Sequence, residues 1–415
     1  MFIPDVRYTS ERVCRILVLM FGTKVAPGRS LVVFDISASS VGAAVAHGDL
    51  SAAPSLLWVK RVEFGYQNGQ DYTQYARLML SALLEVGMAL AGDGMRVASL
   101  CPGFDVRHLS LYCVLGSPWC FTSVETASYA PNETFEITHS LLDAQRNAMY
   151  TTTMASEACA AWQAVTEHAT LLEVHDLSTR VNGYAVDRVE GRRAAALAQT
   201  VCIAVAPEAI LEQVREVLSR VLPVHVSRVQ IQSAVRVLVS GYVRKHGELA
   251  RNMFFVNISG QISDIVCVRK GIPQTIRSVP VGMHDILTAL APRAQSYMEA
   301  VSEAKIALSH AHPKDFSDLI EGADSVVATF RDALISGLGA VVAGAAPPHR
   351  VCVVCDEDWY PLFEKILETP WVQPGVRKPA SLAVDYFAGA KETIDRVLKE
   401  HDVRLEAVVR AVDDA

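Results

Sequence analysis

Two stretches of the chain share one succession of apolar and polar positions. In the first, Leu31 to Val45, an apolar run leads into Asp35, a turn at Ser37 to Ser40 and an apolar return. In the second, Phe254 to Gly271, an apolar run leads into a turn with Asn257, Ser259 and Gly260, then a β-type return. A strand, a small-residue turn with free backbone N–H groups and a returning strand form an anion cradle. Two such hairpins predict two related halves that clamp one phosphate chain.

The rest of the first half alternates between strand and helix patterns. Residues 56–64 alternate like a strand, and 72–91 carry apolar residues at helical spacing. From about residue 105 the pattern changes to a strand that is interrupted at Gly116 to Cys120, two mixed or helical segments and an Asn182-Gly183 turn, which is a strong hairpin signal. This block reads as a small α+β insertion in the first half.

The α/β order then resumes. The pattern predicts strands at 200–205, 224–231, 275–279 and 350–354, and helices at 207–221, 233–245, 284–290, within 294–345, at 361–367 and at 392–412. We therefore expect an N-terminal extension (1–28), a first domain in two parts (29–104 and 196–250), an inserted subdomain (105–195), a second domain (251–380) and a C-terminal helix (381–415).

Composition narrows the class of protein. With 415 residues, of which 51% are hydrophobic and 20% charged, the chain is a globular protein of more than one domain. Its net charge of -7 argues against nonspecific binding of nucleic acid. The sequence shows neither a run of eighteen uninterrupted apolar residues nor the pattern of a secretion signal. Its nine cysteines lie mostly in apolar runs and are expected to be buried structural thiols, including Cys352 and Cys355 with their CxxC spacing.

Five motifs, in order along the chain, carry a family resemblance. LVVFDISASSV and FVNISGQISDI are similar to the two phosphate hairpins of the actin-like ATPases. The segment where an inserted subdomain returns to the core is resembled by VNGYAVDRVEGRRAAAL. The segment after the second hairpin is resembled by IRSVPVGMHDIL, and a helix near the nucleotide by SEAKIAL. Together, over about residues 29–375, they resemble the FtsA and PilM branch of that superfamily.

The resemblance implies an α/β fold of actin-like (ribonuclease H-like) type, with two domains closing on a nucleotide and a subdomain inserted in the first. It also implies a cytoplasmic adaptor that docks the tail of a membrane protein of a bacterial cell-division or type IV pilus assembly machine. The expected cofactors are ATP and Mg²⁺, and self-association into filaments is a further expectation. No membrane-targeting tail is evident, so we expect no direct membrane insertion, and contact with the inner face of the membrane only through a partner.

The resemblance also assigns roles to single residues. Asp35 would hold Mg²⁺ through water, and Asp264 and Gln232 would polarise or orient the attacking water. The nucleotide-binding residues would be Ser37, Ser39, Ser40, Asn257, Ser259, Gly260, Gln261, Ser263, Gly282, Glu303 and Lys305. Taken alone, Asp35 fits an Asx-turn residue that caps a hairpin, and the second hairpin favours the phosphate site instead. Gln232, as an isolated residue, fits a plain polar surface position better.

Several positions depart from the family pattern. Asn257 replaces an aspartate, while Ser37 and Ser259 stand where glycine lets the backbone approach phosphates. After the last strand, Cys355 to Asp358 replaces a glycine turn with three carboxylates. These departures predict weak or absent hydrolysis, and they favour as an alternative a pseudo-ATPase scaffold with a decayed nucleotide site. A sugar-kinase-type enzyme is a less favoured alternative, because no general base for a substrate hydroxyl stands out. Trp119, next to Pro118, fits a partner surface and core packing equally well.

Overall fold

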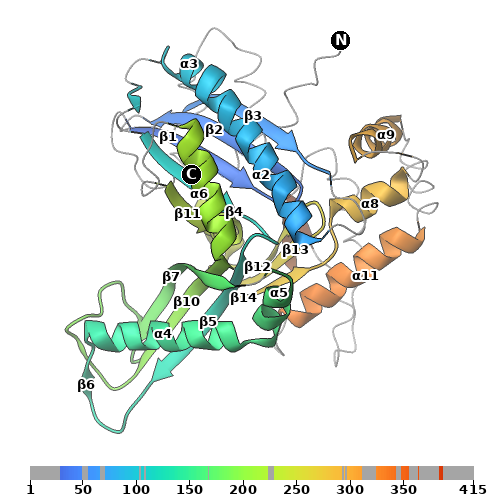
Figure 1. Cartoon of the computed structure of the whole chain (residues 1–415). Coiled ribbons are helices and arrows are strands. Elements are labelled where there is room, and N and C mark those ends of the chain that lie inside the picture. Colours follow the sequence, from blue (N-terminus) through green and yellow to red (C-terminus); the bar gives the residue numbers. More distant parts are fainter. Residues whose placement is uncertain are drawn as a thin grey trace.

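Two five-stranded sheets of identical topology form the body of the protein (Figure 1). The computed structural model describes residues 29–48, 55–65, 71–101, 104–106, 109–166, 168–222, 229–291, 294, 297–310, 324–342, 347–354, 363 and 383–386. In each sheet three antiparallel strands are followed by two strands parallel to the first.

The first sheet has the order β11-β4-β1-β2-β3 and the second the order β14-β13-β12-β15-β16. The strands of the first are β1 (Arg29–Ile36), β2 (Ser40–Gly48), β3 (Ser55–Glu63), β4 (Leu109–Leu115) and β11 (Val229–Ser233). Those of the second are β12 (Asn252–Ile258), β13 (Ser263–Arg269), β14 (Ile272–Val279), β15 (Arg350–Val354) and β16 (Ala383–Tyr386). This repeated order, with helices between the strands, is the predicted actin-like fold.

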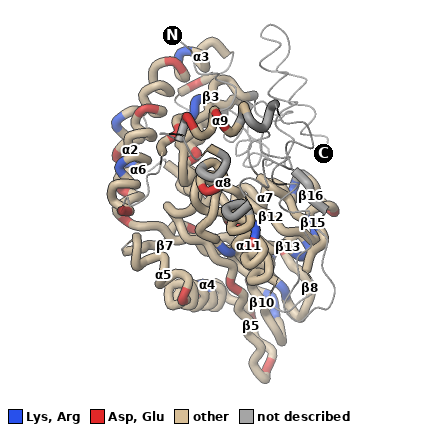
Figure 2. Tube along the Cα trace, turned by 90° about the vertical axis from the view of Figure 1, so that its right-hand side faces the viewer, with Lys and Arg blue, Asp and Glu red and all other residues tan. Residues whose placement is uncertain are grey.

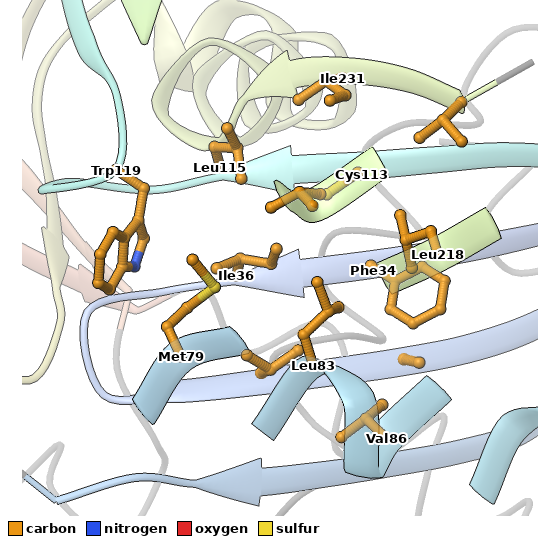
Figure 3. Packing of buried hydrophobic residues seen from close by; sticks show 14 of the residues in the cluster. Phe34, Ile36, Met79, Leu83, Val86, Cys113, Leu115, Trp119, Leu218 and Ile231 are labelled. Atoms are coloured by element: carbon orange, nitrogen blue, oxygen red, sulfur yellow. The ribbon is translucent and has the colours of Figure 1, made fainter. Parts of the chain in front are cut away.

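Helices cover the sheets because the central strands are apolar on both faces. On β1, Val32, Phe34 and Ile36 face α2 (Tyr72–Ala89) and α6 (Glu208–Val221), whereas Leu31 and Val33 lie on the opposite face with α7 (Ala234–His246). Figure 3 shows the first of these clusters, with Trp119 at its end nearest the hairpin turn.

The second cluster joins the two domains. Leu238 and Tyr242 of α7 pack with residues of both sheets, among them Val33 on β1 and Phe255 on β12. A buried α7 between the two sheets makes them parts of one core, so the distance between the domains is set by apolar packing as well as by contacts at the hairpins.

One helical run is long and apolar enough to cross a membrane by length and composition, Tyr72–Ala98. It comprises α2, the π-helix η1 (Leu90–Gly94) and α3 (Met95–Ala98), and it begins at Asp71, whose carboxylate accepts a hydrogen bond from the Gln74 amide (2.7 Å). Tyr75, Met79 and Leu83 point into the first core. The run is therefore a core helix of the first domain.

The helices of the second domain lie against one face of its sheet. They are α8 (Met283–Leu290), α9 (Tyr297–His310) and α11 (Asp324–Ala340), within the two ranges predicted to be helical. Phe330 and Leu334 of α11 pack with Val256 and Ile265 of the sheet. The predicted helices at 361–367 and 392–412 and the extension 1–28 lie outside the described residues, apart from residue 363.

The inserted subdomain is a separate sheet with its own helices, in the lower part of Figure 1. Its sheet, in the order β5-β10-β7-β8, packs α4 and α5, and β6 pairs with β9. The elements are β5 (Phe121–Tyr129), β6 (Phe135–Glu136), α4 (His139–Ala155), α5 (Glu157–Thr166), β7 (Ala169–Val181), β8 (Tyr184–Ala185), β9 (Arg193–Ala194) and β10 (Leu197–Pro207). Asn182 and Gly183, both with positive φ, form the predicted hairpin turn.

Strand pairing places three predicted boundaries differently. The strand β4 belongs to the first sheet, because it pairs with β1 and β11, so it is not part of the inserted block 105–195. The strand β10 belongs to the inserted sheet, because it pairs with β5 and β7, although we expected the first domain to resume at 196. Likewise β16 extends the second sheet to residue 386, where we expected a C-terminal helix from 381. In each case the strand's sheet is determined by pairing partners far away in the sequence, which the local pattern does not reveal.

Candidate functional site

The two predicted hairpins share an equivalent strand register and an equivalent turn hydrogen bond. The amide of Ser37 donates to the carbonyl of Ser40 (2.9 Å), and in the second hairpin the amide of Ser259 donates to the carbonyl of Ile262 (3.1 Å). Asp35 and Asn257 each stand two residues before the serine that opens the turn. The hairpins are thus equivalent elements of two repeated halves, as the sequence pattern indicates.

In the first hairpin, the Asp35 carboxylate forms a buried ion pair with Arg61 of β3 (Oδ2 to Nη2, 2.6 Å). The side chains of Asp35 and Arg61 are 0% and 5% exposed. The second guanidinium nitrogen of Arg61 donates to the Ser40 hydroxyl (2.7 Å). The Asp35 carboxylate, which we expected to hold Mg²⁺, is therefore paired with the Arg61 guanidinium.

Strand register explains how Arg61 reaches Asp35. Gly42 on β2 is opposite Asp35 on β1, and on its other side it is opposite Arg61 on β3. Residues directly opposite each other project on the same face of a sheet. Because Gly42 has no side chain, the guanidinium extends across β2 to the carboxylate two strands away.

The serine turn of the first hairpin satisfies its own polar groups. The Ser37 hydroxyl hydrogen-bonds the carbonyl and the hydroxyl of Ser40 (both 3.0 Å) and accepts from the Ser40 amide (3.2 Å). The Ser37 carbonyl accepts from the indole N–H of Trp119 (2.7 Å), whose ring is fully buried beside Tyr72 and Tyr75. Trp119 is therefore a core residue that supports the hairpin, which decides between its two predicted roles.

The second hairpin carries an equivalent row across its sheet. Asn257, Asp264 and Ser278 are opposite one another on β12, β13 and β14. Asp264 is 1% exposed, and its Oδ1 accepts from the hydroxyls of Ser278 and Ser117 (both 2.7 Å). The Asn257 amide donates to Oδ2 (3.4 Å). Hydrogen bonds from both domains therefore surround this carboxylate.

The hairpins also contact each other directly. The Ala38 amide donates to the Ser259 hydroxyl (3.2 Å), and Ser117 of the loop after β4 reaches Asp264 and Ser278 in the second domain. A Cβ added to Gly260 would lie 2.4 Å from the Cβ of Ser39. We call these contacts the latch: Ser117 with Asp264 and Ser278, Ala38 with Ser259, and Ser39 against Gly260.

The start of α8 closes the other side of the second hairpin. The amides of Met283 and His284 donate to the carbonyls of Ser259 and Gly260 (2.8 and 2.7 Å). A Cβ on Gly282 would lie 2.5 Å from the Ser259 carbonyl oxygen, so only glycine fits there without a shift. The helix N-terminus, elsewhere an anion site, here satisfies hairpin carbonyls.

The remaining predicted site residues lie away from these contacts or outside the description. Gln261 is half-buried, and the buried Ser263 donates its hydroxyl to the Val281 carbonyl (2.8 Å). Gln232 is half-buried on β11 and Glu303 is exposed on α9, and no described hydrogen bond or ion pair joins either of them to a hairpin. The side chain of Lys305 and the turn from 355 to 358 lie outside the described residues.

Sequence reasoning missed Arg61, Ser117 and Ser278. Each is a common polar residue in an otherwise ordinary strand or loop, and its partner is far away in sequence. The one available signal was Gly42, since a glycine inside a strand marks a close approach.

These contacts decide whether the residues fit Mg²⁺ and the phosphates of ATP. A Mg²⁺ ion held through water requires carboxylate oxygens that face a hydrated space. Asp35 is instead buried against a guanidinium, Asp264 is enclosed by hydroxyl and amide donors, and the hairpin tips that would wrap the phosphates touch each other. Within the described ranges there is also no cluster of three or more His, Cys, Asp or Glu side chains placed for a metal. In this arrangement the residues do not fit a metal–phosphate group.

Buried thiols surround the first hairpin. Burial, together with the nearby Asp264 charge, raises the pKa of Cys120 to about 12, and its thiol donates to the Leu115 carbonyl. Burial likewise raises the pKa of Cys113. Since the nucleophile is the thiolate, neither group is suited to chemistry near neutral pH.

No protein-family model matches the chain, and a search of the curated proteins finds no match. Solved structures do resemble it. The PilM-PilN type IV pilus biogenesis complex is 13% identical with a TM-score of 0.48, and the match covers 88% of this chain and 91% of that one. The ethanolamine utilization protein EutJ from Carboxydothermus hydrogenoformans is 10% identical with a TM-score of 0.40, covering 91% and 92%.

A third similar structure is a protein with an actin-like ATPase fold and unknown function from Bacteroides thetaiotaomicron. It is 8% identical with a TM-score of 0.39, and the match covers 96% of this chain and 98% of that one. The fold of this chain is actin-like on its own strand order and pairing in both sheets.

Proposed function

We propose that this protein is an actin-like interaction scaffold whose two domains are held closed by its own side chains rather than by a nucleotide. The observation that carries the proposal is the buried Arg61–Asp35 ion pair at 2.6 Å. It puts a permanent positive charge where the resemblance implies a metal.

The charge of Asp35 explains why an arginine can take the place of a metal ion beside it. A buried carboxylate is strongly disfavoured without a positive or hydrogen-bonding partner. In a nucleotide site a divalent cation supplies that charge only while it is bound, whereas a guanidinium, always protonated, supplies it continuously. Arg61 supplies this charge at one oxygen of the Asp35 carboxylate, Oδ2, without a ligand.

The latch supports the same conclusion for the interdomain contact. In a ligand-closed clamp, phosphate oxygens accept hydrogen bonds from both hairpin turns. Here the Ala38 amide instead donates to Ser259, and Ser117 instead donates to Asp264. The hairpin groups that would bridge to phosphates bond across the interface directly.

A scaffold of this kind fits the adaptor role that the sequence resemblance implies. Its partner would be the tail of a membrane protein of a division or pilus assembly machine. A closed body that needs no nucleotide would present the same surface to that partner at all times, so assembly would depend on partner concentration and not on ATP.

The test is calorimetric titration of the full chain with ATP and Mg²⁺, together with melting curves. We expect no saturable heat and an unchanged melting temperature, whereas a ligand at about a hundred times its Kd would stabilise the folded state by roughly 2.7 kcal/mol. The double variant Asp35→Ala, Asp264→Ala should also give a flat titration, but at a lower melting temperature.

Saturable binding by the wild type that disappears in the double variant would overturn the proposal. It would favour the nucleotide-binding adaptor instead, with the clamp opening to admit its ligand. ATP turnover abolished by Asp264→Ala would contradict the scaffold in the same way.

A further inference from the structure

A basic surface lies at the end of the second sheet that is farthest from the hairpin turn. The strand β12 begins there and ends at the hairpin, and β15 runs parallel to it. Figure 2 shows blue segments around β13 and β15 on this side of the molecule. We call it the basic face: Arg244, Leu249, Arg251, Lys270 and Arg350.

The contacts of the backbone bring these residues together. The Gly271 amide, next to Lys270, donates to the Arg251 carbonyl (2.9 Å). A Cβ on Gly271 would lie 3.5 Å from Val243, which directly precedes Arg244 at the end of α7. Arg350 begins β15, beside the start of β12.

The face has a local excess of positive charge. Its four cations face one described carboxylate, Glu248, which pairs with Arg251 at 2.8 Å. Arg244, Lys270 and Arg350 form no described ion pair, in a chain whose net charge is -7. A local field opposite to the overall charge orients a protein toward an anionic surface and leaves other orientations repelled.

Leu249 adds an apolar group in the middle of these charges. It lies in the 3-10 turn η4 (Gly247–Ala250) and is 56% exposed. An exposed leucine contributes nothing to binding a nucleic-acid backbone. Among the described residues beside Leu249, Tyr242 is buried and His246 is half-buried against it, so neither ring is exposed for base stacking. At the headgroup boundary of a bilayer, however, an apolar side chain among cations gains from both hydrophobic transfer and charge attraction.

We propose that the basic face docks the protein peripherally on an anionic lipid surface. The proposal does not depend on the nucleotide-free scaffold, since the face lies at the opposite end of β12 from the latch. It adds a direct contact to the partner-mediated route to the membrane that we expect from the sequence.

The test is sedimentation of the full chain with vesicles of phosphatidylcholine alone and of phosphatidylcholine with about one third phosphatidylglycerol. We expect binding to the anionic vesicles only, and weaker binding as salt screens the charges. Each cation removed should weaken binding about five-fold, so Arg244→Ala with Lys270→Ala should lower it by about 25-fold. Leu249→Ser should weaken binding at low and at high salt alike.

The matched control is Arg180→Ala with Arg188→Ala. Both arginines are exposed on the inserted subdomain and form no described ion pair, so this variant changes net charge equally while the basic face stays intact. It should bind as the wild type does. An equal loss in the control, an absence of binding to anionic vesicles, or tighter binding to duplex DNA than to vesicles would each overturn the proposal.

Discussion

At the scale of single residues, the proposed nucleotide-free scaffold rests on Arg61. An ion pair this deeply buried is weak support for stability as a whole, because both charges lose hydration, but the loss of one partner is costly. We therefore expect the loss of either Arg61 or Asp35 alone to lower the free energy of unfolding more than the loss of both together.

A double-mutant cycle tests that dependence. Arg61→Met should lower the free energy of unfolding by about 3–5 kcal/mol, since it leaves the Asp35 carboxylate buried without its guanidinium. Asp35→Leu with Arg61→Met should lose less than the single Arg61 variant, because no charge remains buried. Urea unfolding followed by circular dichroism measures both. A loss below about 1 kcal/mol in Arg61→Met would contradict a tightly coupled pair.

The buried thiols give a prediction about pH. The pKa of Cys120 is raised from an ordinary 9.0 to about 12, and burial also raises the pKa values of Cys113 and Cys202. A raised folded-state pKa means that the unfolded chain loses thiol protons first as pH rises. The stabilising contribution is complete below about pH 9 and declines toward pH 12. Cys120→Ala should therefore make the fall in unfolding free energy between pH 9 and 11 shallower, by up to about 2 kcal/mol over that range.

Alkylation tests the protonation and accessibility of the buried thiols independently. Because burial raises the pKa of Cys120 to about 12, its thiol is almost entirely protonated at pH 8. Native protein treated with iodoacetamide and mapped by mass spectrometry should carry label on the half-buried Cys101 before Cys120. Rapid labelling of Cys120 would show that the region around the first hairpin opens readily.

At the scale of elements, the similarity between the two domains extends to single polar positions of their hairpins. Asp35, Gly42 and Arg61 form one row across three strands, and Asn257, Asp264 and Ser278 form the equivalent row in the other sheet. In each row a carboxylate is enclosed, once by a guanidinium and once by hydroxyl and amide donors. The two sheets thus place a buried, hydrogen-bonded carboxylate in equivalent rows.

The hairpins were predictable from sequence because strand, turn and return are local patterns. The actin-like fold was expected from the family resemblance that the hairpins and three further motifs carry. The partner of Asp35 was not predictable, because Arg61 becomes its neighbour only through the register of β1, β2 and β3. For the same reason, β10 was assigned to the first domain, although it pairs within the inserted sheet. The local sequence pattern predicts the strands and helices. Pairing between strands far apart in the sequence decides which side chains come into contact.

Gly260 tests the contact between the hairpin tips. Gly260→Ala places a Cβ 2.4 Å from that of Ser39, so one hairpin must shift, and we expect a loss of about 1–3 kcal/mol in unfolding free energy. Ser39→Gly in the same chain should recover part of the loss. Gly92→Ala is the control, because a Cβ there meets nothing within 4 Å and should be neutral or slightly stabilising. Equal effects of Gly260→Ala and Gly92→Ala would argue against tip contact.

At the scale of the whole molecule, two features join the domains. The helix α7 packs between the sheets in a shared apolar core, and the latch joins the hairpins at the other end. Packing fixes the average distance between the domains, and the polar latch fixes their closure. A variant that weakens only the latch should therefore keep the fold and loosen the hairpins.

Hydrogen exchange distinguishes this arrangement from a clamp that closes on a ligand. Amides of residues 36–41 and 256–264 should be strongly protected in the wild type without nucleotide, and ATP with Mg²⁺ should not change their exchange. Ser117→Ala removes one hydrogen bond to a buried carboxylate, worth about 1.5–3 kcal/mol, so exchange in both hairpins should accelerate at least ten-fold. If the scaffold closes without a ligand, as we propose, nucleotide should not restore protection. Protection that appears in the wild type only after ATP and Mg²⁺ are added would mean that the latch is the resting contact of a ligand-gated clamp.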